Sequence, residues 1–440
     1  MTRRQTLIAA LMLCLGAEAG AYPLDGQEDT GIRRLEGYRL AQEAKSGPKL
    51  TSGQLLSTAD IRLRLLDYSG PDFDELPQDP DLAAFLAATL APRDPSYTMV
   101  IVDLTDPARI RWAGLRPDLQ QNAGSVGKLV TMAGFFMALR DAFPDTAERA
   151  RILRETSVRA GDWIGVEQHK VPKWQADTGL NASSVIVPAD EFRLSEWLDH
   201  AISASANGAG AIVWREAMLL RHFGSAYPVT EEARTRFFAQ TPKAELGALA
   251  LATMTDPLRE AGIDTANLQQ GSLWTANAKA KIPGSRSFAT ARELTRVAFR
   301  IEQGRLVDEW SSLEMKKYLY MTKRRYRYAY APELARSAVY FKSGSLYSCK
   351  AEEGFRCGKY MGNDRNLMNS VAIVEGDGAS DREPQLHYIA TLMSNVLRFN
   401  SAWDHARIAA AVHETLRTRQ IQTLQEAASA RTIEESGKSE

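Results

Sequence analysis

The sequence predicts an α+β protein of two lobes: one antiparallel β-sheet built from both ends of the chain, with an all-helical lobe inserted between them. Strand-like apolar segments lie near both ends of residues 96–420, and helical patterns fill the middle. Strands that are grouped apart from helices are typical of the α+β class. The 440 residues, 44% of them hydrophobic, suffice for one large or two medium domains with a sizeable core.

The strands are predicted from short runs of β-branched and aromatic residues bounded by turn residues. They are expected at residues 98–104, 109–115, 339–347, 369–374 and 386–396. A closing helix is expected at 402–416, followed by a polar, frayed tail at 421–440.

The middle of the chain shows helical periodicity. Residues 192–202 place Leu194, Trp197, Leu198 and Ala201 on one face, and a loop of small residues at 203–210 follows. Further helices are expected at 211–223, 244–254, 289–304 and 308–321.

The N-terminus has the pattern of an export signal. Residues 1–21 hold a charged start, a short apolar run and a small-residue cleavage site after Ala21, which predicts a periplasmic or secreted protein. The apolar run is too short to span a bilayer well, and no later segment is apolar for long enough. Residues 22–95 are interpreted as an N-terminal extension and a proline-rich linker around one short helix at 81–90, with no assigned chemistry.

The composition limits which kinds of partner and cofactor the chain is expected to bind. The chain has 54 basic and 54 acidic residues, so it offers no general attraction to nucleic acid. Its six histidines show no metal-ligand spacing, and no metal or cofactor is predicted. Cleavage removes Cys14 and leaves Cys349 and Cys357, whose proximity in an exported chain favours a disulfide over two free thiols.

Ser125 and Lys128 open an apolar run from Leu129 to Leu139. A run that is apolar on every side predicts a buried helix, and residues three apart lie one turn apart on one face. Burial favours a neutral lysine amine, which can activate a serine nucleophile. The alternative interpretation is that Ser125 only caps the helix and that Lys128 is a solvated residue of its first turn. A second match, Ser46 to Lys49, contains a proline and precedes no apolar helix, so we set it aside.

Two further motifs follow in order: Ser205-Ala-Asn207 in a loop between helices, and Lys342-Ser-Gly344 on a strand. With Ser125-Val-Gly-Lys128, this series resembles the penicillin-recognising serine enzymes, namely class A β-lactamases and penicillin-binding proteins. The resemblance covers roughly residues 96–418 and includes the helix before Ser205 and the segment 288–294. The alternative interpretation, with each residue considered alone, is that Ser205 and Asn207 cap turns and Lys342 is a surface lysine on a strand.

The resemblance implies a role for each residue. Ser125 is the nucleophile, Lys128 its base and Ser205 a proton relay to the leaving nitrogen. It also implies that Asn207 bonds to an amide of the substrate, and that Lys342 and Ser343 bind the substrate carboxylate. Gly344 would let the substrate approach the strand closely. The backbone N–H groups of Ser125 and Ser345 would form the oxyanion hole.

The sequence departs from the family pattern in two places. Ala206 stands where the second motif usually has Asp. The position of the glutamate that activates the deacylating water in class A enzymes falls near Thr275, and residues 274–279 hold no carboxylate. Glu245 and Glu293 are possible substitutes that the sequence does not place in the site.

These observations predict an exported serine hydrolase that forms an acyl-enzyme at Ser125 with β-lactams or D-alanyl peptides and has weak or slow β-lactamase activity. An esterase or amidase on the same scaffold, and a binding or sensor protein that is acylated without turnover, remain as alternatives. The basic, aromatic segment 323–330 is interpreted as a solvated loop, although it has the composition to line a cleft. The sequence leaves the oligomeric state open.

Overall fold

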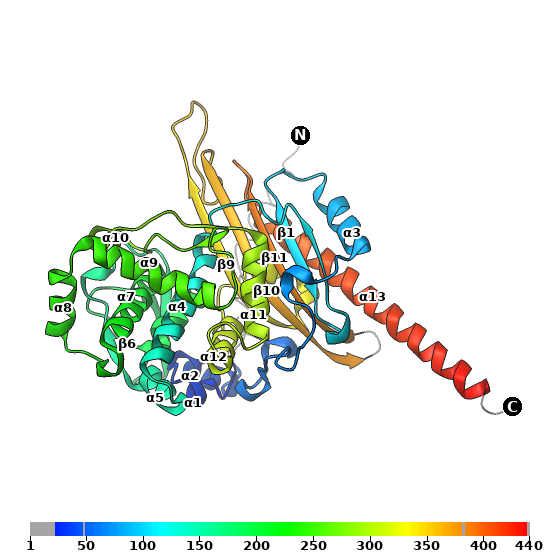
Figure 1. Cartoon of the computed structure of the whole chain (residues 1–440), viewed down its shortest axis with the longest axis horizontal. Coiled ribbons are helices and arrows are strands. Elements are labelled where there is room, and N and C mark those ends of the chain that lie inside the picture. Colours follow the sequence, from blue (N-terminus) through cyan, green and yellow to red (C-terminus); the bar gives the residue numbers. More distant parts are fainter. Residues whose placement is uncertain (1–22, 47–48, 381–382, 438–440) are drawn as a thin grey trace, which may run out of the picture.

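The structure of the protein, a computed structural model, describes residues 23–46, 49–380 and 383–437. A helical lobe lies beside a β-sheet, and a long C-terminal helix extends away on the other side (Figure 1). The predicted signal peptide, with Cys14 and the cleavage site after Ala21, lies outside the described residues.

Five antiparallel strands form the main sheet in the order β2-β1-β11-β10-β9. Their bounds are β1 Thr98–Asp103, β2 Arg111–Leu115, β9 Ala338–Ser348, β10 Arg365–Ser380 and β11 Glu383–Asn395. Strands from the two chain ends meet where Ile101 pairs with Ala390. The predicted sheet built from both ends, with helices inserted, is therefore confirmed. β10 and β11 are longer than expected because their joined ends are polar and contain glycine, which hides the strand pattern.

Alternating residues of the sheet enter two separate cores. Val100 and Val102 of β1 belong to the core on the side of α11 (Ala291–Glu302) and α12 (Glu309–Tyr320). Met99 and Ile101 belong to the core under α3 (Pro80–Leu90) and α13 (Ala402–Gly437). Successive strand side chains point to opposite faces, so a strand buried on both faces must be apolar throughout. This explains the continuous apolar run of β1.

The helical lobe surrounds α4 (Lys128–Ala142), which is buried on nearly every side. It packs against α6 (Leu194–Ile202), α7 (Asn207–Phe223), α9 (Lys243–Glu260) and α12, as its apolar sequence predicts. The other elements are α5 Thr146–Glu155, α8 Glu231–Gln240 and α10 Ala276–Lys281, with the strand pairs β3–β6 (Ser157–Arg159, Glu191–Arg193), β4–β5 (Lys170–Gln175, Leu180–Val185) and β7–β8 (Leu268–Gln269, Phe288–Ala289).

The N-terminal segment is part of the core and not a linker. It contains α1 (Gly26–Thr30) and α2 (Arg34–Glu43). Its apolar residues are buried in the same core as α4; they include Ile32, Leu35, Ile61, Phe73 and Leu76. The apolar residues are spaced irregularly between prolines and acidic residues, so no helix or strand period marks them in the sequence.

A buried ion pair fixes this segment to the helical lobe. Arg34 is 1% exposed, and its Nε lies 2.6 Å from Oδ2 of Asp199 on α6. Arg34 also donates to Ser203 Oγ and to the carbonyl of Met321. One guanidinium thus joins α2, α6 and the end of α12.

The C-terminal tail is helical and not frayed. α13 continues to Gly437 and extends beyond the sheet (Figure 1). Residues 421–431 are mostly exposed, and they are rich in Ala, Glu, Gln and Arg, which favour helix without any burial. Among the described residues, no helix combines the length and the apolar character that crossing a membrane requires.

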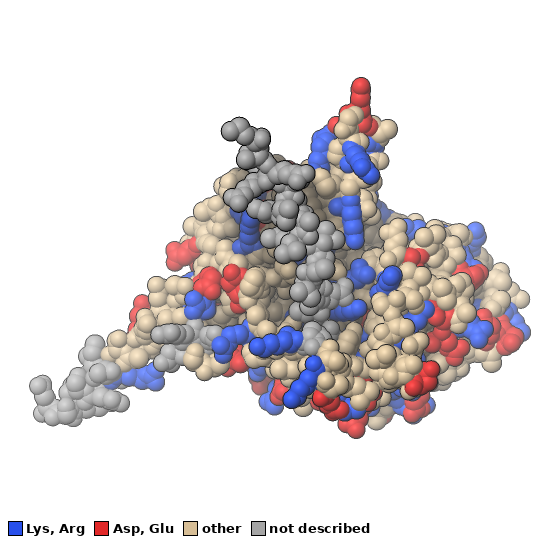
Figure 2. All heavy atoms as spheres, turned by 180° about the vertical axis from the view of Figure 1, so that it is seen from behind, with Lys and Arg blue, Asp and Glu red and all other residues tan. Residues whose placement is uncertain are grey.

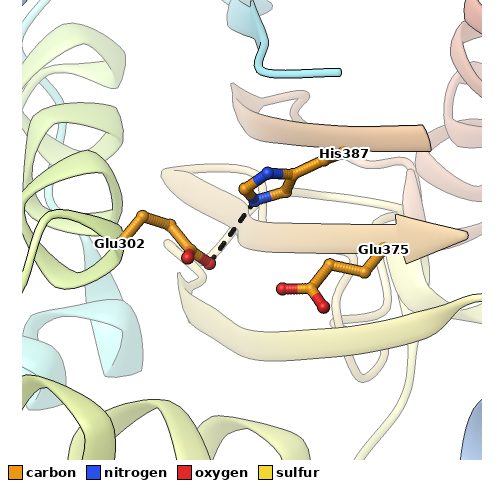
Figure 3. Close-up of side chains that lie close together, drawn as sticks. All are labelled: Glu302, Glu375 and His387. Atoms are coloured by element: carbon orange, nitrogen blue, oxygen red, sulfur yellow. Dashed lines mark ion pairs between the residues drawn. The ribbon is translucent and has the colours of Figure 1, made fainter. Parts of the chain in front are cut away.

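A second buried charge cluster joins the sheet to the helices above it. Glu302 of α11, Glu375 of β10 and His387 of β11 lie close enough to suggest a metal site (Figure 3). The cation already between them is Lys316 of α12, whose Nζ lies 2.5 Å from both Glu302 Oε1 and Glu375 Oε1. Although burial raises the pKa of Glu302, Lys316 and His387 outweigh it, so the carboxyl group is ionised and paired. We interpret this cluster as a structural ion network.

Arg34→Met should lower the free energy of unfolding by about 3–5 kcal/mol, because the change leaves Asp199 as an unpaired buried charge. Arg39→Met on the same helix is the matched control. Arg39 pairs with Glu36 and Glu43 at the surface, so its loss should change the free energy of unfolding far less than the loss of Arg34. Urea unfolding of the three proteins measures both values. Equal stabilities for the two variants would show that the N-terminal segment is not held in this way.

Candidate active site

Ser125 lies in a short 3₁₀ turn, Gly124–Gly127, that leads directly into α4. Lys128, the first residue of α4, is 1% exposed, and its Nζ lies 2.9 Å from Ser125 Oγ. The predicted serine–lysine pair is therefore in contact at the start of a buried helix. Ser46, the set-aside match, donates its hydroxyl to the carbonyl of Ala41.

The Lys128 amine is enclosed by hydrogen-bond acceptors and an aromatic ring. Nζ lies 2.8 Å from Asn207 Oδ1 and 3.2 Å from the carbonyl of Ser205, and 4.2 Å from the ring centre of Trp274. Burial lowers the pKa of Lys128 to about 7, with Glu167 opposing the shift and Arg324 adding to it. A substantial share of the amine is then unprotonated at neutral pH and able to accept the Ser125 proton.

The second and third motifs meet beside this pair. Lys342 Nζ lies 2.9 Å from Ser205 Oγ and 2.8 Å from the carbonyl of Ser343. Burial lowers the pKa of Lys342 well below its usual value, and the positive charge of Lys128 adds to the shift. Ser205 has φ +60°, a left-handed conformation that costs energy in a residue other than glycine and persists only where the surrounding structure holds it.

The small residues after Ser205 allow this packing. α7 begins at Asn207, four residues earlier than the sequence predicts, so Asn207 is its first residue and not part of a loop. A Cβ at Gly210 would lie 3.0 Å from Lys128 Cε and 2.8 Å from Trp274. Ala206 is fully buried in the apolar core, where a charged Asp would be costly.

Gly344 has a different role from the one that the sequence suggested. An ideal Cβ on Gly344 would lie 2.3 Å from the carbonyl oxygen of Ala123 and 2.9 Å from the backbone N of Ser125. The glycine is therefore needed for contact between β9 and the Gly124–Gly127 turn that carries Ser125, rather than only for the approach of a substrate. On the other side, a Cβ at Gly124 would lie 3.0 Å from the backbone N of Ser345. This close contact brings the two expected oxyanion-hole nitrogens together.

A cleft of about 560 Å³ opens in front of Ser125 at the junction of the lobes. Its charged lining residues are all cationic: Lys279, Arg324, Arg327 and Lys359. Among the described lining residues no Asp or Glu occurs. Such a cleft attracts anionic ligands.

Arg327 is a residue of the cleft that no motif singles out in the sequence. The segment 323–330 is not a solvated loop but follows the alternative interpretation, because Arg324, Tyr326 and Arg327 line the cleft and Arg327 is only 4% exposed. Its Nη1 donates to the carbonyl of Gly344 at 2.9 Å, its guanidinium lies 5.5 Å from the ring centre of Tyr360, and its Nε has no hydrogen-bond partner in the described chain. No described carboxylate pairs with it, and burial lowers its pKa. A buried cation of this kind is suited to an anionic ligand.

The predicted disulfide between Cys349 and Cys357 is present, with a Cα–Cα distance of 6.1 Å. It closes a loop in the hairpin between β9 and β10, which projects from the body and carries basic side chains (Figure 2). Lys359 and Tyr360, just after Cys357, line the cleft. The crosslink thus restrains one wall of the cleft, and a loop of this size contributes about 2–3 kcal/mol in the chain-entropy model.

None of the three residues considered for deacylation lines the cleft. Thr275 donates its hydroxyl to the carbonyl of Trp163 at 2.6 Å and caps α10. Glu293 accepts from the backbone N of Asp264, and Glu245 is exposed on α9. The cleft wall instead includes His169 with Glu167 behind it, a pair that no sequence motif indicated.

Three solved structures that resemble this chain each have a TM-score below 0.5. No protein-family model and no curated protein sequence matches the chain. Among solved structures, a class A β-lactamase from Bacteroides cellulosilyticus has 14% identity and a TM-score of 0.49, covering 76% of this chain and 96% of that one. A structure described as PBP-A has 13% identity and a TM-score of 0.48, covering 78% and 98%. A β-lactamase from Sphaerobacter thermophilus has 16% identity and a TM-score of 0.47, covering 75% and 94%.

Gly344→Ala should both destabilise the protein and slow the reaction of Ser125, because the new methyl group pushes β9 away from the Gly124–Gly127 turn. We expect a loss of about 1–3 kcal/mol in unfolding free energy, as is usual for overpacking, and slower labelling by a fluorophosphonate. Gly376→Ala on β10 is the control, since the nearest atom to its Cβ is 3.4 Å away. If Gly344→Ala matches Gly376→Ala in both assays, the contact does not shape the site.

Proposed function

We propose that the chain is an exported serine hydrolase that is acylated at Ser125 by β-lactams or D-alanyl peptides and releases the acyl group slowly. The observation that carries this proposal is the contact between Ser125 Oγ and the buried amine of Lys128, with its pKa near 7. The pattern of residues 1–21 supports export.

Acylation follows from the contacts around the pair. Neutral Lys128 takes the Ser125 proton while Oγ attacks the substrate carbonyl. The backbone N–H groups of Ser125 and Ser345 stabilise the resulting oxyanion. The Ser205 hydroxyl then protonates the leaving nitrogen. It recovers a proton from Lys342, whose Nζ lies 2.9 Å from Ser205 Oγ, or from Lys128, whose Nζ lies 3.2 Å from the Ser205 carbonyl oxygen.

The charge of the cleft supports an anionic substrate. Arg327 is buried and has no carboxylate partner among the described residues. Lys342, whose pKa burial holds well below its usual value, would regain its charge beside a bound carboxylate. Binding a substrate carboxylate would supply the missing counter-charge, and an Arg–carboxylate pair is one of the stronger polar contacts in proteins. Penicillins and D-alanyl peptides carry such a carboxylate, whereas neutral esters do not. This favours the proposed substrates over a general esterase or amidase.

One observation keeps a sensor role as a second candidate. Glu245, Glu293 and Thr275 do not line the cleft, and no carboxylate is found among the described residues that do line it. A protein that is acylated and hardly turns over acts as a covalent binding protein. Complete retention of the acyl group, for as long as the protein stays folded, would favour this role.

Benzylpenicillin should add once to Ser125 and remain bound long enough to be seen by intact-mass spectrometry. Release should be about 10²–10⁴-fold slower than from an acyl-enzyme that has a carboxylate base positioned at its ester. Ser125→Ala should abolish the adduct and Ser46→Ala should leave it unchanged. Labelling that survives Ser125→Ala, or fast turnover without an adduct, would contradict the proposal.

The acylation rate should depend on pH through Lys128. The neutral amine is the active form, so the rate should fall about tenfold per unit below pH 7 and reach a plateau above it. Stopped-flow mixing with a chromogenic cephalosporin measures this constant, and circular dichroism at each pH controls for folding. A rate that still rises steeply between pH 9 and about 10.4, where an exposed lysine titrates, would refute a neutral Lys128.

A further inference from the structure

Glu167 and His169 form a hydrogen-bonded pair in the segment before β4, beside the start of α7. Nδ1 of His169 lies 2.9 Å from Oε1 of Glu167. Oε2 of Glu167 accepts from the backbone N of Gly208 at 2.6 Å, one residue after Asn207, which contacts Lys128. The pair is thus joined to the serine–lysine site through two adjacent residues of α7.

Glu167 is a fixed anion rather than a base. Its side chain is 2% exposed, and Oε1 also accepts from the backbone N of Gln168 and of His169. Although burial raises the pKa of Glu167, these donors and the imidazole outweigh it and lower the pKa to about 2. An ionised carboxylate only accepts hydrogen bonds, so His169 must carry its proton on Nδ1. The lone pair of Nε2 is then available.

His169 has the chemistry of a base at the cleft. It lines the cleft with Ser125, is 26% exposed, and its Nε2 has no hydrogen bond within the described residues. The other titratable side chains that line the cleft are lysines, arginines and tyrosines. A neutral imidazole oriented by a carboxylate is the usual partner of a serine acyl-enzyme.

We propose that His169, oriented by Glu167, is the general base for the slow hydrolysis of the Ser125 acyl-enzyme. Nε2 removes a proton from a water molecule as the water oxygen bonds to the ester carbonyl carbon. The tetrahedral oxyanion collapses, the bond from carbon to Ser125 Oγ breaks, and Oγ takes the proton from the imidazolium. The products are the free serine and the carboxylic acid. This inference rests on the proposed function, because it requires an acyl-enzyme at Ser125.

The charges around His169 set the pH at which it acts. Burial lowers the pKa of His169 below its usual value; Arg324 and Lys128 act in the same direction, and Glu167 opposes them. Neutral imidazole is the base and its pKa is lowered, so deacylation should begin to fall at a lower pH than it would for an ordinary imidazole with a pKa of about 6.5. Acylation should already be falling at pH 7, so the two steps have separate pH profiles.

The test measures the two steps separately with benzylpenicillin. Intact mass gives the acylation rate, and the decay of the purified adduct gives the release rate. In His169→Ala, the adduct should form at close to the wild-type rate and decay at least tenfold more slowly, and added imidazole should restore decay in proportion to its concentration. Glu167→Gln should also slow decay and change its pH profile. His222→Ala, outside the cleft, is the control.

Each outcome has a separate meaning. Decay that is unchanged in His169→Ala, or slowed without rescue by imidazole, would overturn the role of His169 as base while leaving Ser125 acylation intact. Absence of any adduct on the wild-type protein would instead overturn the proposed function, and the inference with it. Urea unfolding curves of His169→Ala and Glu167→Gln show whether a loss of stability, rather than loss of the base, explains slower decay of the adduct.

Discussion

Burial of the Lys128 amine is the constraint on which the rest of the structure depends. An ammonium in this position lacks the water that would stabilise its charge, so the neutral form becomes accessible near pH 7. The burial is achieved by a helix that is apolar on all sides, by the Trp274 ring over the amine, and by Gly210, which leaves room for the lysine chain. Residues that look merely structural therefore set the chemistry of Ser125.

The site lies at the contact between the two lobes, and the fold secures that contact with buried charges as well as apolar packing. The Glu302–Lys316–Glu375 network joins the sheet to α11 and α12, and Arg34–Asp199 fastens the N-terminal segment to α6. Buried pairs of this kind cost more when broken than they contribute when formed. These pairs fix which elements meet, so that Gly344 and Gly124 can bring β9 against the Gly124–Gly127 turn that carries Ser125.

The sequence predicts those features whose signal is local. The five strands, the buried α4, the three motifs and the disulfide each follow from short patterns or spacing. Features that depend on distant contacts were missed or misread. Arg327 resembles any residue of a basic loop, and only the fold places it against β9 and Tyr360. The apolar residues of 49–79 are buried without a helix or strand period, so no local pattern marks them. The Glu167–His169 pair meets α7 across about 40 residues of chain, and α13 continues past residue 421 on helix propensity alone.

The central claim, that Lys128 is neutral near pH 7 and so activates Ser125, is tested most directly by titrating the lysine itself. Selective ¹³C labelling at the lysine Cε positions and NMR between pH 5 and about 11 would follow each amine, and Lys128→Ala would identify the Lys128 signal by its loss. We predict one lysine resonance that titrates near pH 7 and is absent in Lys128→Ala. A Lys128 resonance that titrates near 10.4, like an exposed lysine, would contradict the account.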